Sequence, residues 1–401
     1  MASLPAYFLD DVRRSFPIAQ QMTYLNHASI SPVPLATLAV MNDVNTRLTT
    51  DPGSLLAPPA AGGSDIFTRF STEIGALINA ADPSEVVGVV STSAGINAAA
   101  QAIDWQPGDN VVFTDVEFPS NAYPWMALAR RGVESRTVAP QGGGLTVEAL
   151  DAVVNARTRL VAVSAVQFFS GHRADLIALG AYCHERGILF AVDAIQAAGH
   201  IPIDVQAMHI DILAAGGQKS LMGPPGQGFL YVRREVSERM TPDGIGPTAV
   251  EGWEHWLHYD LTLRGGAQRF MMGTPNLSGM FGLLESIRFL RELDVAAIDD
   301  WTRYLSQVAI NALDELGCEV ITPHDPAQLG PIVTFRVGTG DDLARAEAES
   351  NALMAHFGAH KIRLTKHLDA AGWPHVRIST HCYNTEEEVC RAAAALKEFH
   401  P

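Results

Sequence analysis

Short apolar runs that alternate with amphipathic stretches constrain the fold of this sequence more than any other feature. Several of these runs contain no polar alternation, as expected for strands that are covered on both faces. Helical patterns, such as residues 175–186, lie between many of them. This alternation predicts an α/β fold with a mostly parallel sheet and helices on both sides. The predicted strands are residues 86–90, 110–114, 135–138, 159–166, 188–192, 212–215 and 229–232.

The length of the chain and a change of pattern near Pro275 predict two domains. At 401 residues the chain is too long for one simple core, so we expect a large domain and a smaller one. After Pro275 a long helical stretch runs to about Leu316, and a mixed pattern of apolar runs and helices follows. We therefore expect an N-terminal segment at 1–22, a large domain at 23–276 and a small C-terminal α+β domain at 277–401.

Charge and hydropathy exclude several classes of partner. The net charge of -16 argues against nucleic acid, because binding to a phosphate backbone needs a basic surface. No apolar stretch reaches membrane-spanning length, and the first residues lack a basic region followed by an apolar one. We therefore expect a cytoplasmic protein with no membrane partner. The four cysteines show no CxxC spacing, so neither a metal site nor a disulfide framework is predicted.

Lys219 is the first candidate catalytic residue. It follows the apolar run 212–215 on a glycine-flanked loop that Pro224, Pro225 and Gly226 close. Glycines let a bulky group approach the backbone closely, and loss of hydration at the end of a buried strand makes a lysine amine more nucleophilic. This is the chemistry of the Schiff-base lysine that holds pyridoxal phosphate. A plain surface loop is the alternative.

Asp193 is the second candidate, because it directly follows the apolar run 188–192. Its carboxylate is expected at the carboxyl edge of the sheet, where ligands of such sheets bind. A pyridoxal ring needs a carboxylate at its ring nitrogen, since the protonated pyridinium withdraws electrons from the substrate. Gln196 is placed to donate to the phenolic oxygen of the same ring. The alternatives are an acid that caps the next helix and a solvated glutamine.

A phosphate-binding turn is the third element. Residues 86–101 form a strand, a turn of small residues and an alanine-rich helix. The backbone N–H groups of Ala94 and Gly95, with the helix dipole, are expected to hold a dianion, and Ser93 adds a hydroxyl. The pattern is neither a P-loop nor the G-x-G-x-x-G of dinucleotide-binding folds.

Together these motifs resemble the class V aminotransferases of fold type I. The shared motifs are Asp193-Ala-Ile-Gln196, the Lys219 loop, Ser93-Ala-Gly95 and Gly273-Thr-Pro-Asn276, and the resemblance covers nearly the whole chain. That family includes cysteine desulfurases, isopenicillin N epimerase-like enzymes, kynureninases and serine–pyruvate-type aminotransferases. The resemblance implies a fold type I pyridoxal-phosphate-dependent transferase, with a mostly parallel seven-stranded sheet in a large domain and a smaller C-terminal α+β domain.

The resemblance also implies a role for each matching residue. Lys219 resembles the Schiff-base lysine, Asp193 the pyridinium partner, Gln196 the donor to the phenolic oxygen, and Ser93, Ala94 and Gly95 the phosphate turn. Thr274 matches a threonine that reaches the phosphate of the neighbouring subunit, which implies a homodimer with shared sites.

Further matches concern the ring and the substrate. Phe118 matches the residue that stacks on the pyridine face, with core packing as the alternative. Gln167 lies where relatives carry a polar residue near the ring. Arg377 matches the arginine that binds a substrate carboxylate, a task suited to a planar donor with two prongs. Asn26 and His27 match a motif near the substrate mouth, where His27 has an equal claim to a structural role.

Departures from the family pattern bear on the reaction. Desulfurase relatives often carry a histidine just before the lysine and a serine three residues before it, where this chain has Gln218 and Gly216. The absent serine implies that phosphate binding depends more on Ser93 and Thr274. Residues 361–374 contain no cysteine, so a desulfurase-type catalytic cysteine is not expected.

The expected reaction is amino-group transfer on an α-amino acid, which the Gln218–Lys219 pair slightly favours. The alternatives are a C–S lyase that acts by β-elimination, and an amino-acid epimerase. Epimerisation needs a second base on the opposite ring face, for which His27 or Tyr123 is the candidate. A non-catalytic binding protein is disfavoured, because it has no need of Lys219, Asp193 and Arg377 together.

Overall fold

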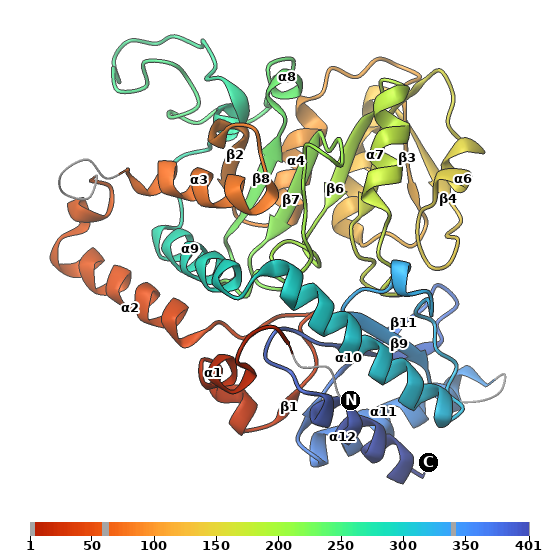
Figure 1. Cartoon of the computed structure of the whole chain (residues 1–401). Helices are drawn as coiled ribbons and strands as arrows, with labels where there is room; N and C mark the ends of the chain where they lie inside the picture. The colour runs from red at the N-terminus through yellow and green to blue at the C-terminus, as the bar shows by residue number, and fades with distance from the viewer. Residues whose placement is uncertain (1–4, 58–63, 338–341, 401) are drawn as a thin grey trace.

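The computed structural model describes residues 5–57, 64–337 and 342–400. A seven-stranded sheet with the order β2-β8-β7-β6-β5-β3-β4 forms the centre of the molecule (Figure 1). Only β8 runs antiparallel to its neighbours, so the mostly parallel sheet expected from the apolar runs is confirmed. The strands are β2 (Val86–Val89), β3 (Asn110–Thr114), β4 (Glu134–Val138), β5 (Thr158–Ser164), β6 (Leu189–Asp193), β7 (Ile212–Gly216) and β8 (Gly228–Val232).

Helices cover both faces of this sheet, which explains why its strands are apolar without alternation. Along β5, Leu160 and Ala162 face one core, whereas Val161 and Val163 face the other. The first core contains α4 (Thr92–Ala102), α5 (Tyr123–Met126) and α8 (Arg234–Ser237). The second contains α3 (Ile66–Ile78), α6 (Val147–Asp151), α7 (Leu176–Glu185) and α9 (Leu277–Glu292).

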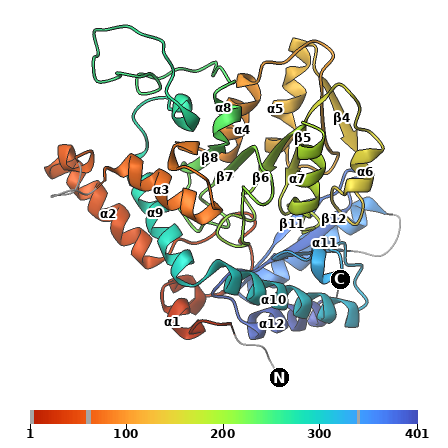
Figure 2. The same cartoon turned by 45° about the horizontal axis from the view of Figure 1, so that its top comes forward.

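A smaller three-stranded antiparallel sheet, with the order β11-β12-β9, lies beside the large one (Figure 2). Its apolar side chains pack with those of three helices in a separate core. Its strands are β9 (Ile332–Arg336), β11 (Thr365–Leu368) and β12 (Pro374–Ser379), and the helices are α10 (Val295–Glu315), α11 (Leu343–Ala359) and α12 (Glu386–Glu398).

The expected long helix after Pro275 is two helices. Asp294 has a φ of 69°, and this left-handed conformation ends α9. Its side chain accepts a hydrogen bond from the N–H of Ala296 and thereby caps the start of α10. Helix α9 packs in the core of the large sheet and α10 in that of the small one. The domain division at 276 and 277 stays a prediction.

The N-terminal part of the chain contacts the C-terminal part. Strand β1 (Thr23–Tyr24) pairs with β10 (Ile362–Arg363). Arg13, on α1 (Leu9–Arg14), donates to the carbonyl of Tyr383 and pairs with Glu388. Helix α2 (Leu35–Thr50) packs against α9. In the described part of the chain, no helix is long and apolar enough to cross a membrane.

Candidate active site

A cavity of about 370 Å³ lies at the edge of the large sheet where the parallel strands end. This is the edge at which open α/β sheets bind ligands. The segments that follow β2, β3, β5, β6 and β7 form one wall, and β11, β12 and the segment after β1 form the other. The lining residues are Ala28, Ser29, Ser91, Thr92, Ser93, Phe118, Ser120, Phe168, Ile195, Gln218, Lys219, His367 and Arg377.

Lys219 enters this cavity from the loop after β7. Its Nζ lies 5.2 Å from the centroid of the Phe118 ring. The pKa of the amine is lowered to about 8, chiefly by burial and also by the charge of Arg377, whereas the Asp193 carboxylate opposes the shift. A Cβ on Gly217 would lie 2.9 Å from the carbonyl oxygen of Gln227, so the tight loop needs glycine there. The loop therefore presents a nucleophilic amine to the cavity.

This lowered pKa predicts selective acylation of Lys219. In cofactor-free protein with limiting acetic anhydride, the Lys219 peptide should be modified faster as the pH rises through about 8, where its amine loses the proton. An ordinary lysine reaches the same state only near ~10.4. Peptide mass spectrometry gives the rates, with the exposed Lys361 and Lys397 as internal references. Equal pH dependence of all these peptides would contradict the prediction.

Asp193 is the last residue of β6 and is 2% exposed. Its Oδ1 accepts from the N–H of Ile195, whereas its Oδ2 is buried and has no hydrogen-bond partner in the part of the chain that the structure describes. Burial raises the pKa of this carboxyl to about 7, and Glu117 adds to the rise, while the N–H of Ile195 and the charge of Lys219 oppose it. A buried carboxylate oxygen without a hydrogen-bond donor costs free energy of folding. A ligand with a positively charged N–H beside Oδ2 would remove that cost.

Glu117, a residue that the sequence did not single out, lies buried near Asp193. It accepts from the backbone N–H and hydroxyl of Ser164, from Asn121 and from Gln167. Burial raises the pKa of Glu117, although these hydrogen bonds oppose the rise. The hydrogen bond from Gln167 to Glu117 orients the Gln167 amide with Nε2 toward the carboxylate. Its Oε1 is buried with no hydrogen-bond partner among the described residues. Gln167 is therefore held rigidly beside the site but does not line the cavity.

The phosphate turn is the start of α4. Ser91 caps this helix by accepting from the N–H of Ala94, and the N–H of Gly95 donates to the carbonyl of Ser91. From the sequence we expected these two N–H groups to bind a dianion, but in the structure both donate to Ser91. The first N–H groups of a helix have no partner within it, so Thr92 and Ser93 present theirs instead. The Ser93 hydroxyl lies 2.6 Å from that of Ser120 at the cavity wall.

Gly216 occupies the position where desulfurase relatives carry serine. A Cβ there would lie 2.6 Å from Oε1 of Gln218 and 3.3 Å from Oγ1 of Thr92. Oγ1 of Thr92 accepts from the N–H of Gly216. Gln218 and Thr92 therefore fill the space that a serine side chain would need.

Arg377, on β12, is 2% exposed and lines the cavity opposite the large sheet. Nη1 donates to the carbonyl of Phe168 over 2.6 Å, and Nη2 donates to the hydroxyl of Ser29 over 2.9 Å. Both partners are uncharged, and Nε is buried with no hydrogen-bond partner among the described residues. Burial lowers the pKa of the guanidinium to about 10, so it stays charged at neutral pH. A buried cation of this kind is suited to an anionic ligand.

Other predicted residues lie away from the cavity. His27 packs against Tyr24, His381 and Tyr383, and its Nδ1 lies 3.0 Å from the Ser31 hydroxyl. Its burial favours the structural role that the sequence left open. Gln196 donates to the carbonyl of Ala28 over 2.9 Å, which leaves its second N–H for another acceptor.

Asn26 pairs with Ser379 through a parallel bridge, and Thr274 is exposed outside the cavity. The cysteines also lie elsewhere: Cys183 and Cys382 are buried, Cys318 is half-buried and Cys390 is exposed. Burial raises the pKa of the Cys183 thiol to about 12 and also raises that of Cys382. None of the four is among the described residues that line the cavity.

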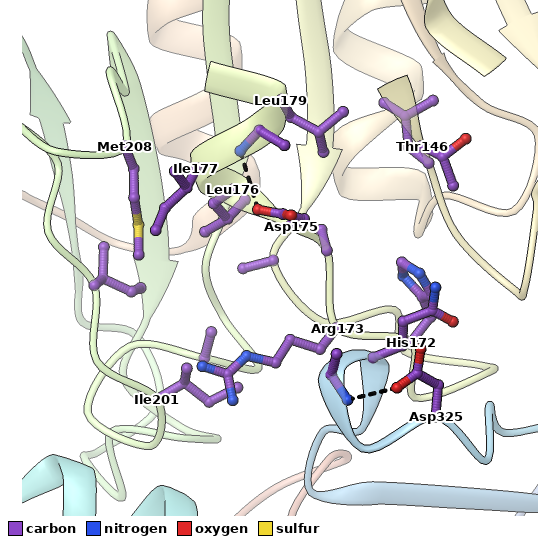
Figure 3. A pocket seen from close by; sticks show the side chains of 18 of the residues that line it. Thr146, His172, Arg173, Asp175, Leu176, Ile177, Leu179, Ile201, Met208 and Asp325 are labelled. Carbon is purple, nitrogen blue, oxygen red and sulfur yellow. Dashed lines mark hydrogen bonds between the residues drawn. The ribbon is translucent and has the colours of Figure 1, made fainter. Parts of the chain in front are cut away.

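A second, larger cavity of about 600 Å³ lies where α7 begins, beside the segment that follows β5 (Figure 3). It contains none of the predicted site residues. Its most buried charge, Asp299, is paired with Arg173 at 2.8 Å. Asp175 caps α7 by accepting from the N–H of Ala178, whereas Nδ1 of His172 and Nε of Arg303 are buried with no hydrogen-bond partner among the described residues.

The chain belongs to the class-V aminotransferase family, whose model matches residues 23–391. It is 29% identical to a probable cysteine desulfurase of Methanothermobacter thermautotrophicus over 97% of this chain and 98% of that protein. The structure of a cysteine desulfurase from Thermococcus onnurineus superposes with a TM-score of 0.84 at 25% identity, covering 99% of each chain. A cystine C-S lyase, at 21% identity and a TM-score of 0.81 over 96% of this chain and 100% of that one, shares the fold.

Family membership makes the protein a pyridoxal 5′-phosphate enzyme of fold type I. The residues present fit this cofactor. The orphaned Oδ2 of Asp193 needs a cationic N–H, which a protonated pyridine ring provides. The start of α4 offers N–H groups to a phosphate, and Phe118 offers an aromatic face near the Lys219 amine.

Proposed function

We propose that the protein acts on a free α-amino acid whose carboxylate binds to Arg377 and whose α-proton is moved by Lys219. The observation that carries this proposal is the buried Arg377 guanidinium, which has only uncharged partners and faces the cavity that holds Lys219. A planar guanidinium binds a carboxylate through two parallel hydrogen bonds. The substrate is thus held at one end while its α-carbon lies near the amine.

The other residues act on binding and charge. Asp193 keeps the cofactor ring protonated, the start of α4 with Ser93 holds its phosphate, and Phe118 packs on its face. When bound, the cofactor withdraws the electron pair left on the α-carbon after proton removal. Thr274 and Gln196 are proposed as further cofactor contacts, from a second subunit and through the second amide N–H, respectively.

For the reaction, we favour β-elimination, with cleavage of a bond between the β-carbon and a heteroatom such as sulfur. The similarity to proteins named cysteine desulfurases supports C–S cleavage. The absence of cysteines from the cavity lining argues against transfer of the sulfur to a thiol of this chain. Lys219 then needs only to remove the α-proton, after which the β-substituent leaves.

Amino-group transfer is the second candidate. It requires the same Lys219 amine to move a proton between two carbon atoms, and Gln218 before the lysine favours it. Epimerisation is less favoured because His27 packs in a buried aromatic cluster and Tyr123 is 65% exposed.

A panel of amino acids, with and without pyruvate or 2-oxoglutarate, separates these reactions. Pyruvate with sulfide or ammonia, released from cysteine or serine without an added acceptor, supports β-elimination. New amino acid formed only when a keto acid is present supports transfer instead. Inversion with solvent deuterium at the α-carbon supports epimerisation. If no amino acid in the panel exchanges its α-proton with solvent, the proposed function is wrong.

We also propose that the protein is a homodimer. The loop between α8 and α9, at the upper left of Figure 1, exposes a set of large apolar side chains. Leu257 and Tyr259 are 90% and 92% exposed, and Trp253, Trp256 and Leu261 lie near them in sequence. Exposed large apolar side chains gathered on one loop suit an association site, and Trp and Tyr are enriched in protein interfaces. The exposed Thr274 follows the same loop.

Charges in this loop should therefore weaken the dimer. Leu257→Asp with Tyr259→Asp places two carboxylates in the proposed interface, where burying them unpaired is costly. Light scattering coupled to gel filtration should show a dimer for the natural protein and a monomer for this variant. Phe8→Asp is the matched control, because Phe8 is 82% exposed outside the loop. A monomeric natural protein would contradict the homodimer.

A further inference from the structure

Two lining residues of the cavity carry a buried side-chain nitrogen without a hydrogen-bond partner among the described residues. One is Nε of Arg377, whose role is proposed above, and the other is Nε2 of His367. A buried polar atom without a partner costs free energy, and such atoms in native structures usually face a ligand or a water molecule. Nε2 of His367 can therefore form a hydrogen bond with a ligand in the cavity.

The register of the small sheet brings His367 and Arg377 to the same face. Thr365 pairs directly with Arg377, and His367 lies two residues along the same strand. Side chains two residues apart share a face, so His367 is the diagonal neighbour of Arg377. A substrate whose carboxylate is bound to Arg377 is thus within reach of the imidazole.

Burial and the charges around the cavity determine the protonation state of this imidazole. Burial is the main cause that lowers the pKa of His367 to about 4, and the positive charges of Arg377 and Lys219 lower it further. The ring is neutral at pH 7, so one nitrogen donates and the other accepts. Nε2 has no hydrogen-bond partner among the described residues, and the ring packs edge-to-face with Phe168 at 5.8 Å between centroids.

We propose that His367 determines side-chain specificity by forming a hydrogen bond with a heteroatom on the β-carbon of the substrate. This proposal rests on the proposed function, because it needs the α-carboxylate on Arg377. Most of the other polar side chains that line the cavity already have hydrogen-bond partners: the hydroxyls of Ser93 and Ser120 face each other, Ser91 accepts from Ala94, Ser29 accepts from Arg377 and Thr92 accepts from Gly216. Gln218 also lines the cavity, next to Gly216, whereas His367 lies beside Arg377.

The same surroundings define the class of side chain. Arg377 and Lys219 repel a cationic side chain. A second carboxylate would find no cation beyond these two among the lining residues, whose charges already have a role. A cavity of about 370 Å³ that also holds the cofactor favours a short side chain. Small neutral amino acids with a β-hydroxyl or β-thiol, such as serine or cysteine, satisfy all three conditions.

The test compares L-serine and L-cysteine with L-2-aminobutyrate, which has the same shape but a methyl group in place of the heteroatom. Binding is followed by the change in absorbance of the cofactor-loaded protein, and α-proton exchange is followed by NMR in deuterated water. In His367→Leu the preference of the natural protein for serine or cysteine over 2-aminobutyrate should fall about tenfold, the usual effect of one lost hydrogen bond. His367→Gln, which keeps a donor and an acceptor, should restore part of it.

His375→Leu is the matched control, because His375 pairs with His367 in the sheet and packs on Phe169 outside the cavity. It should leave the preference unchanged. Equal weakening of all three amino acids in His367→Leu would show a packing role and overturn the proposal. That outcome differs from failure of the proposed function itself, in which the natural protein exchanges no α-proton at all.

Discussion

Lys219→Ala should lower the rate of α-proton exchange by about 10³-fold, within the range that general acid–base groups contribute. The amine lies in the cavity, and its pKa is lowered to about 8, chiefly by burial, so far more of it is unprotonated near neutral pH than of an ordinary lysine. The variant should also lose covalent attachment: borohydride should fix the cofactor to the Lys219 peptide of the natural protein and to no peptide of the variant. Exchange by NMR and peptide mass spectrometry measure the two effects.

Two further variants separate chemistry from charge and folding. Lys219→Arg keeps a positive charge but has no amine that can lose its proton near neutral pH, so it should be as inactive as the alanine variant. Lys397→Ala, on the exposed end of α12, should behave as the natural protein does. Exchange at the natural rate in Lys219→Ala would remove the lysine from the reaction.

Arg377→Ala should raise the KM for an α-amino acid between about tenfold and 100-fold. A hydrogen bond to a charged group contributes ~1.5–3 kcal/mol, and the variant removes the one buried cation proposed to bind the substrate carboxylate. Cofactor affinity should change little, because the direct contacts of Arg377 are Phe168 and Ser29. Arg377→Lys should recover only part of the loss, since an ammonium group cannot bind a carboxylate through a planar pair of donors. Steady-state kinetics and cofactor titration measure these quantities.

The control for this series is Arg345→Ala, because Arg345 lies exposed on α11. Thermal unfolding of each variant shows whether loss of the buried guanidinium weakens the fold. An equal loss of substrate and cofactor affinity in Arg377→Ala would contradict its assignment to the carboxylate.

Local pattern was sufficient to predict the large sheet and the residues at its carboxyl edge. Asp193 and Lys219 each follow an apolar run, and parallel strands bring their carboxyl ends to one edge whatever the lengths of the loops. The same reasoning located the turn before α4. It assigned the N–H groups of Ala94 and Gly95 to the phosphate. In the structure, the N–H of Ala94 donates to the Ser91 side chain and that of Gly95 to the Ser91 carbonyl. Cap geometry decides which N–H groups remain.

Glu117 and Ser29 show what local pattern cannot supply. Glu117 lies three residues beyond β3, as many solvated acids do, and only its hydrogen bonds to Ser164 and Gln167 reveal a buried network beside Asp193. Ser29 has no signal in the sequence, since its partner Arg377 is 348 residues away. Contacts between segments far apart in the sequence decide both cases, and these contacts depend on which segments pack together.

The sequence by itself determined the fold class, the cofactor and the strand-end residues proposed to hold it, because strand period and strand-end position are local properties. The opposite wall of the cavity was decided by tertiary structure alone. Antiparallel pairing of β11 with β12 sets His367 beside Arg377, and packing of the small sheet against the large one turns both toward Lys219. We propose that this wall binds the substrate, and its geometry depends on packing between distant segments that no local pattern records.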